Sequence, residues 1–169
     1  MATKRIIFMG RSGSGKTTLI EALRGEELVY RKTQYIDYSA DFMDTPGEYT
    51  EGNDLGGALA VYSYEADVVG LVLSATDDFC IFPPACAPVA NRPVVGVITK
   101  CDDPDARADL ARMRLEECGC TPIFETSSKT GQGIEDLLRY LGFEPENHIK
   151  TTQNRSKIQE KQQKVLKKC

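Results

Sequence analysis

Residues 10–17 have the types and spacing of a phosphate-binding loop, G-x-x-x-x-G-K-[ST]. Its glycines let the backbone curl so that successive N–H groups point at one anion. Lys16 can then reach the β- and γ-phosphates of a nucleotide, where its charge also makes it a catalytic candidate, and the Thr17 hydroxyl can ligate Mg²⁺. The residues expected to bind the phosphates are Gly10, Ser12, Gly13, Ser14, Gly15, Lys16, Thr17 and Thr18.

A second candidate element is Asp-Thr-Pro-Gly at residues 44–47. Asp44 can hold Mg²⁺ through water, and Gly47 can swing its N–H toward a γ-phosphate when one is present. D-x-x-G alone carries little information, but at this distance after a phosphate loop it becomes specific. One threonine between the two motifs should complete the Mg²⁺ shell. Thr33 is the candidate, with Ser39 as the alternative.

The third element is Thr99-Lys100-Cys101-Asp102, directly after the apolar run at residues 94–98. It resembles the N/T-K-x-D motif with which GTPases read guanine. One carboxylate, that of Asp102, accepts from both N1–H and the exocyclic amine of guanine, whereas adenine offers no such pair of donors. The alternative is a solvated polar loop. A further set, Ser127, Ser128 and Lys129, follows the next strand and could support the base edge.

These motifs need a sheet to position them, and strand-like and helix-like patterns alternate along the chain. The expected strands are residues 5–9, 35–37, 41–43, 68–74, 94–99 and 121–125, and the expected helices are residues 16–24, 55–64, 105–118 and 134–141. Continuous apolar runs are typical of strands that are buried on both faces. The pattern predicts an α/β fold: a three-layer, doubly wound domain with a mostly parallel six-stranded sheet. Together with the motifs above, this arrangement resembles a P-loop NTPase of the small GTPase-like kind.

The charge divides the chain into an acidic body and a basic tail. Residues 1–144 carry 14 basic and 23 acidic side chains, whereas residues 145–169 carry 7 and 2. The acidic body argues against a nucleic-acid partner. We expect a nucleotide-binding domain over residues 1–143 and a polar tail over residues 144–169, either a solvated helix, a disordered segment or a docking peptide. No apolar stretch is long enough to span a bilayer, which favours a cytoplasmic protein.

Six cysteines are present, but their spacing lacks the paired C-x-x-C of a zinc site. Reduced structural thiols are the expectation, with a metal or disulfide site as the alternative.

Longer stretches of the sequence show a closer resemblance to one known family. Over residues 4–142 the motifs and their order resemble a small GTPase of the translation-factor superclass. Residues 5–18, 32–34, 44–49 and 74–77, with Ile-Phe-Pro-Pro at residues 81–84, are similar to the ethanolamine-utilisation P / propanediol-utilisation V family. The resemblance implies GTP/GDP and Mg²⁺ as ligands and a bacterial protein encoded with a metabolic microcompartment. Its partners would be shell or enzyme proteins.

Hydrolysis needs an aligned water molecule, and many GTPases place a glutamine after the D-x-x-G glycine to orient it. Glu48 occupies that position here. A carboxylate can accept a proton from water but repels the γ-phosphate oxygens, so we expect slow intrinsic turnover unless Glu48 simply faces solvent. Arg11 is a minor candidate for an internal arginine finger.

Three functions are compatible with these residues. The first is a slow GTP-hydrolysing switch in ethanolamine or propanediol utilisation. The second is a nucleotide-dependent small-molecule kinase acting on a carboxylate. Its only candidate acceptor region is residues 77–93, which hold no basic residue before Arg92. The third is a low-turnover nucleotide-bound adaptor. The guanine motif favours the first and third, whereas ATP binding would favour the second.

Overall fold

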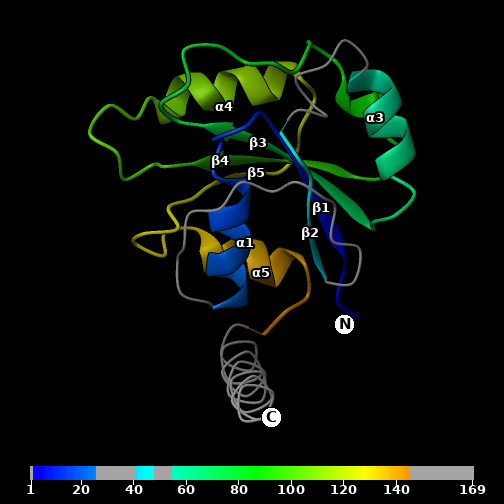
Figure 1. Cartoon of the computed structure of the whole chain (residues 1–169), viewed down its shortest axis with the longest axis horizontal. Helices are drawn as coiled ribbons and strands as arrows, with labels where there is room; N and C mark the ends of the chain where they lie inside the picture. Colours follow the sequence, from blue (N-terminus) through cyan, green and yellow to red (C-terminus); the bar gives the residue numbers. More distant parts are fainter. Residues whose placement is uncertain (1, 26–40, 48–54, 145–169) are drawn as a thin grey trace, which may run out of the picture.

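A sheet of five parallel strands forms the centre of the computed structural model, which describes residues 2–25, 41–47 and 55–144 (Figure 1). The strand order is β2-β1-β3-β4-β5. The strands are β1 (Ile6–Met9), β2 (Phe42–Asp44), β3 (Val68–Ser74), β4 (Val94–Thr99) and β5 (Ile123–Glu125). Every residue of β1 to β4 is buried, as expected for a parallel sheet that is covered on both faces.

Helices cover both faces of this sheet (Figure 1). Helices α1 (Lys16–Arg24) and α5 (Ile134–Tyr140) lie on one face, and α3 (Leu55–Tyr62) and α4 (Ala108–Glu117) lie on the other. A short 3₁₀ helix, η1 (Ala87–Val89), lies in the connection between β3 and β4. The predicted three-layer α/β architecture is therefore confirmed.

Two apolar clusters separate the layers. On one face, Leu19 and Leu23 of α1 and Leu137 of α5 pack with Ile6 and other residues of the sheet. The second cluster joins the opposite sheet face to α3 and α4, whose buried side chains include Leu59 and Leu115. Each helix thus buries one apolar stripe, and the sheet between them fixes the ends of the strands in space.

The predicted boundaries need several corrections. Helix α3 ends at Tyr62 rather than at residue 64, and α4 begins at Ala108 rather than at residue 105. Before α4, the backbone N–H groups of Asp105 and Ala106 bond to the side chain and carbonyl of Asp103, which forms a turn instead of a first helical turn. Strand β5 begins at Ile123 rather than at residue 121, and β2 is shifted by one residue.

The sheet of the described residues has five strands where six were expected. The missing one, residues 35–37, lies outside the described residues, as does the hairpin that it was expected to form. All pairings among the five strands are parallel. The basic tail, residues 145–169, is likewise outside the described residues.

Phe143, near the end of the described residues, is 8% exposed and packs with α1 and α5. Its ring centroid lies 5.1 Å from that of Phe42 in β2. Aromatic pairs at this separation add to the stability that burial supplies. Phe143 therefore belongs to the packed body.

Within residues 2–25, 41–47 and 55–144, no helix is both long enough and apolar enough to cross a membrane.

Candidate nucleotide site

The carboxyl ends of all five strands meet at one edge of the sheet. Parallel pairing places Phe8 beside Asp44, Ser74 beside Thr99 and Ile98 beside Glu125. Each candidate motif follows one of these strand ends, so the topology gathers segments that are far apart in the sequence. In open α/β sheets this edge is where ligands bind.

The phosphate-binding loop runs from the end of β1 to the start of α1. Gly13 and Gly15 have φ angles of 77° and 90°, which a side chain would make costly. Lys16 is 5% exposed, and its Nζ donates to the carbonyls of Gly10 (2.7 Å) and Arg11 (2.9 Å). The ammonium group therefore already lies across the loop, where it can meet an incoming phosphate.

Two of the three candidate metal ligands, Thr17 and Asp44, are in direct contact. The Thr17 hydroxyl donates to Asp44 Oδ2 over 2.5 Å, although 27 positions separate the two residues. The Thr45 hydroxyl donates to the Phe8 carbonyl and holds this end of β2 against β1. A hydroxyl and a carboxylate are the hard oxygen donors that Mg²⁺ prefers, so the pair fits this ion.

These two ligands do not make a complete metal site. The described part of the chain holds no group of three or more His, Cys, Asp or Glu side chains that could bind a metal. Mg²⁺ is commonly held by one or two protein ligands together with substrate phosphates. The donor set at Thr17 and Asp44 is therefore of the kind that binds Mg²⁺ with a nucleotide.

Gly47 lies against the phosphate loop. A Cβ added at Gly47 would come within 2.2 Å of the Ser12 nitrogen, so no larger residue fits there without moving the backbone. The close approach places a backbone segment that follows β2 directly beside the loop. Residues 48–54 come next and lie outside the described residues, together with the predicted site residues Glu48 and Thr33 and the alternative Ser39.

The Thr99–Asp102 segment supports the phosphate loop from the other side. The Thr99 hydroxyl donates to the Ser14 carbonyl over 2.5 Å, and Lys100 Nζ donates to the Gly13 carbonyl over 2.8 Å. Lys100 adopts a left-handed backbone conformation, with φ of 59°. The stem of Lys100 thus crosses from the turn after β4 to the phosphate loop.

Asp102 is held by the loop after β5. Its Oδ1 accepts a hydrogen bond from the Ser127 hydroxyl over 2.6 Å. This bond, aided by the charge of Lys129, keeps the pKa of Asp102 below its ordinary value. The carboxylate is exposed and ionised, which is the state that accepts hydrogen bonds from a base.

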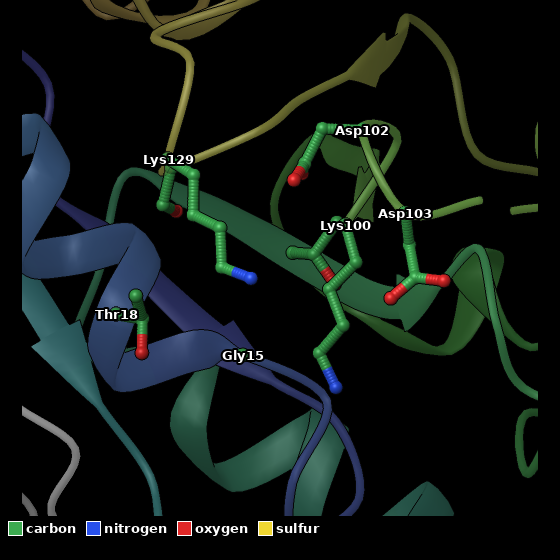
Figure 2. Close-up of a pocket in the computed structure, with 8 residues that line it drawn as sticks. Gly15, Thr18, Lys100, Asp102, Asp103 and Lys129 are labelled. Atoms are coloured by element: carbon green, nitrogen blue, oxygen red, sulfur yellow. The ribbon is translucent and has the colours of Figure 1, made fainter. Parts of the chain in front are cut away.

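A cavity of about 160 Å³ lies between these segments (Figure 2). Its walls come from three places: the start of α1, the turn after β4 and the loop after β5. The lining residues are Gly15, Thr18, Thr99, Lys100, Asp102, Asp103, Ser128 and Lys129. The structure therefore brings together seven of the predicted binding residues in one pocket, and adds Asp103, which was not among them.

Arg11 of the phosphate loop contacts the segment that follows β3. Its Nη1 lies 3.4 Å from Asp77 Oδ1, and its guanidinium lies 4.9 Å from the centre of the Phe79 ring. Arg107 and Arg114 of the α4 region also donate to the carbonyl of Asp77. Three arginines thus reach the start of residues 77–93, a segment that has no basic residue of its own before Arg92.

Comparison with known proteins agrees with this geometry. The family model PduV-EutP, described as ethanolamine utilisation - propanediol utilisation, matches residues 3–143. The chain is 40% identical over 139 residues to the propanediol utilization protein PduV of Citrobacter freundii, covering 82% of this chain and 93% of that one. It is 38% identical over 141 residues to the probable acetate kinase EutP of Salmonella typhimurium, covering 82% and 89%.

The chain is also similar, at lower identity, to a translation factor. The chain is 32% identical over 160 residues to translation initiation factor IF-2 of Nitratiruptor sp., covering 79% of this chain but only 18% of that factor. The match is consistent with a GTPase-like P-loop fold. With a family match over residues 3–143 and 40% identity to a relative of similar length, the chain belongs to the PduV-EutP family.

Proposed function

We propose that the protein binds guanine nucleotides with Mg²⁺ and hydrolyses GTP slowly, as a switch in ethanolamine or propanediol utilisation. The observation that carries the proposal is the pocket between the phosphate loop and Asp102. The pocket joins the two features that a guanine nucleotide requires: donors for phosphate at Gly15 and Thr18, and an ionised carboxylate for the base.

The phosphate end supplies charge neutralisation. Lys16 exchanges its two loop carbonyls for oxygens of the β- and γ-phosphates, and the N–H groups of the curled loop donate to the same oxygens. Thr17 and Asp44 hold Mg²⁺, which neutralises charge on the phosphates when bound. Gly47 offers a backbone N–H beside the loop, where a γ-phosphate distinguishes GTP from GDP.

The base end supplies selectivity. Asp102 accepts from the two N–H donors of guanine, and the Ser127 hydroxyl fixes the carboxylate for that contact. The Lys100 stem and Lys129 flank the pocket, where an aliphatic stem can pack on a base plane (Figure 2). Adenine would leave Asp102 without its donors, which costs affinity.

Turnover is expected to be slow because Glu48 follows Gly47 where many GTPases have glutamine. The γ-phosphate repels a carboxylate, so a water molecule is poorly oriented. A partner, a cation or another residue would then supply the missing acceleration. A chain with no measurable hydrolysis but tight nucleotide binding would instead be an adaptor.

Calorimetry with GTP, GDP, ATP and ADP in the presence of Mg²⁺ tests the proposal directly. We expect tight binding restricted to guanine nucleotides. Equal or tighter binding of ATP would show that Asp102 does not read the base, and the switch proposal would fail. Phosphate release from GTP, measured in the same buffer, separates a slow GTPase from an adaptor.

A second candidate function rests on a relative. The EutP protein of Salmonella typhimurium, 38% identical, bears the name probable acetate kinase. The same phosphate loop could transfer the γ-phosphoryl group to a carboxylate instead of water. Incubation with acetate and either ATP or GTP, followed by ³¹P NMR for acetyl phosphate, decides between the two. Acetyl phosphate formation that disappears in Lys16→Ala would favour the kinase.

The pathway and location follow from the family rather than from the site. We infer a cytoplasmic protein that associates with a bacterial microcompartment through shell or enzyme proteins. A fluorescent fusion expressed with and without the compartment genes tests this inference. Diffuse fluorescence in both cases would contradict it.

A further inference from the structure

Three cysteines from two separate segments meet on the face of the sheet that carries α4. Cys80 and Cys86 lie in the connection between β3 and β4, and Cys118 caps the end of α4. The thiols of Cys80 and Cys118 both donate to the carbonyl of Phe82, over 3.7 and 3.6 Å. Cys86 and Cys118 also belong to the same apolar cluster, against which Cys80 packs.

The backbone holds these segments together. The N–H of Ala85 donates to the Glu117 carbonyl over 2.8 Å, and that of Ala87 donates to the Cys118 carbonyl over 2.9 Å. The connection therefore runs along the end of α4 in a fixed register. A bond between their sulfurs would therefore join two segments that the backbone already holds side by side.

The two thiols that share Phe82 differ in environment. Cys80 is partly exposed, and contacts with Cys118, the Phe82 backbone and the charge of Arg114 lower its pKa to about 7. Cys118 is fully buried, and its contacts with the two neighbouring thiols, together with burial, hold its pKa above the ordinary value. Cys80 is thus the thiol that ionises and meets solvent, and Cys118 stays protonated beside it.

We propose that Cys80 and Cys118 form an oxidation site, at which a hydroperoxide converts the two thiols into a disulfide. The Cys80 thiolate attacks one peroxide oxygen, the O–O bond breaks, and Cys80 becomes a sulfenic acid while the leaving hydroxide or alkoxide takes a proton. The Cys118 sulfur then attacks the Cys80 sulfur, releases water and forms the S–S bond. Two thiols are oxidised and one peroxide is reduced.

The site is connected to the phosphate loop. Asp77 and Phe79, a few residues before Cys80, are the residues that Arg11 of the loop contacts. A bond from Cys80 to Cys118 replaces their shared contact with Phe82 and pulls this part of the connection toward α4. Arg11 would lose its position, and the loop beside it would bind nucleotide less tightly. This second step rests on the proposed nucleotide-binding function.

Thiol mapping of the full chain tests the oxidation site. After stoichiometric hydrogen peroxide, we expect the loss of two free thiols among the six cysteines. A tryptic digest run without reductant should contain a disulfide between the peptide that holds Cys80 and Cys86 and the peptide of residues 115–129, and reductant should separate the two. No Lys, Arg, Asp or Glu separates Cys80 from Cys86 or Cys118 from Cys120, so variants must assign the pair.

Four single variants make that assignment. Cys80→Ser and Cys118→Ser should abolish the link, whereas Cys86→Ser and Cys120→Ser should retain it. In Cys118→Ser, Cys80 should accumulate as a sulfenic acid that dimedone traps, which is informative even if the variant is less stable. A link that survives in Cys80→Ser, or a product that is only an intermolecular dimer, would overturn the proposal.

Binding of fluorescent GDP tests whether oxidation of Cys80 and Cys118 changes the affinity of the phosphate loop for nucleotide. We expect oxidation to raise the Kd of the wild-type chain about fivefold or more, the lower end of typical coupling between sites, and dithiothreitol to reverse it. Peroxide should leave the Kd of Cys80→Ser unchanged. An unchanged Kd in the oxidised wild type would refute the connection. Failure of the reduced chain to bind GDP would instead refute the proposed function, and thiol mapping would still decide the oxidation site.

Discussion

The Thr17 hydroxyl donates a 2.5 Å hydrogen bond to the Asp44 carboxylate, and this bond joins the start of α1 to the end of β2. It links the phosphate loop to the segment that continues into Gly47. Two ligands of one cation must come within a few ångströms of each other, and Thr17 and Asp44 meet this condition. The contact therefore supports the proposed Mg²⁺ site.

Replacement of Thr17 by alanine should uncouple nucleotide binding from Mg²⁺. The hydroxyl is a metal ligand in our proposal, so Thr17→Ala should reduce the effect of Mg²⁺ on GDP affinity, by about tenfold if one good ligand is lost. Binding of fluorescent GDP, titrated with Mg²⁺, measures this effect. A variant with the same Mg²⁺ dependence as the wild type would remove Thr17 from the metal site.

Lys16→Ala should abolish tight nucleotide binding. Hydrogen bonds to charged groups contribute about 1.5–3 kcal/mol each, so the loss of Lys16 should raise the Kd for GDP about 10- to 150-fold. Calorimetry measures the change, and Lys4→Ala is a suitable control because Lys4 lies over the Tyr140 ring instead. Wild-type affinity in Lys16→Ala would disprove the assignment of the phosphate loop.

Gly47→Ala should affect GTP more than GDP. The added Cβ would lie 2.2 Å from the Ser12 nitrogen, so the backbone at Gly47 must move away from the loop and from a γ-phosphate. We expect about a tenfold loss of GTP affinity, the equivalent of one hydrogen bond to a charged group, with a smaller loss for GDP.

Gly56→Ala is the matched control for that substitution. A Cβ at Gly56 meets nothing within 4 Å, and Gly56 lies in α3, where alanine is favoured over glycine. Gly56→Ala should keep both affinities and raise the melting temperature. Equal losses for GTP and GDP in Gly47→Ala would argue against a γ-phosphate sensor at this position.

Base recognition should depend on pH through Asp102. The Ser127 hydroxyl lowers the pKa of Asp102 by donating to the ionised form, so the carboxylate stays charged as the pH falls toward its ordinary range. Ser127→Ala removes this donor and raises the pKa. GDP affinity of the variant should then begin to fall at a higher pH than that of the wild type.

The companion variant Asp102→Asn should shift preference from guanine to xanthine nucleotides. An amide can donate where xanthine carries a second carbonyl, and it cannot accept from both guanine donors. Competition of XDP and GDP for the same site provides the readout. Retained preference for GDP would show that another group reads the base.

The end of the folded body is also open to test. A chain that ends at Glu144 keeps the pair of Phe143 and Phe42, so its melting temperature and GDP affinity should match those of the full chain. A chain that ends at Gly142 loses Phe143, and removal of a buried Phe side chain costs about 3–5 kcal/mol, or about 10 °C. Equal melting temperatures for these two shortened chains would contradict this packing. If the longer one also fails to associate with the compartment, the tail is a docking segment.

Sequence patterns predicted the parts of the site that lie within one segment. The phosphate loop sits between β1 and α1 as expected, and the turn at Thr99–Asp102 follows a buried strand, because buried parallel strands and glycine-rich loops have strong local signatures. The helix starts and strand ends were less accurate. Helix α4 begins later than predicted because of the turn at Asp103. There the Asp105 N–H donates to the Asp103 side chain, and this bond competes with the first helical turn.

Sequence patterns could not predict the contacts between segments that are far apart in the chain. The bond from Lys100 to the Gly13 carbonyl spans 87 positions, and the contact of Arg11 with Asp77 spans 66. The meeting of Cys80 with Cys118 likewise depends on how residues 77–93 lie against α4. Spacing of cysteines in the sequence contained no sign of it, because neither cysteine has a partner at motif distance.

Thr99 and Lys100 make the hydrogen bonds that join the turn after β4 to the phosphate loop, and Asp102 takes no part in these bonds. In the proposed site, base recognition and phosphate binding are therefore carried by neighbouring but different side chains. A substitution at Asp102 should therefore change which nucleobase the protein binds and leave its contacts with the phosphates intact. Such a chain would respond to an added xanthosine nucleotide in a living cell while ignoring the cell's own GTP.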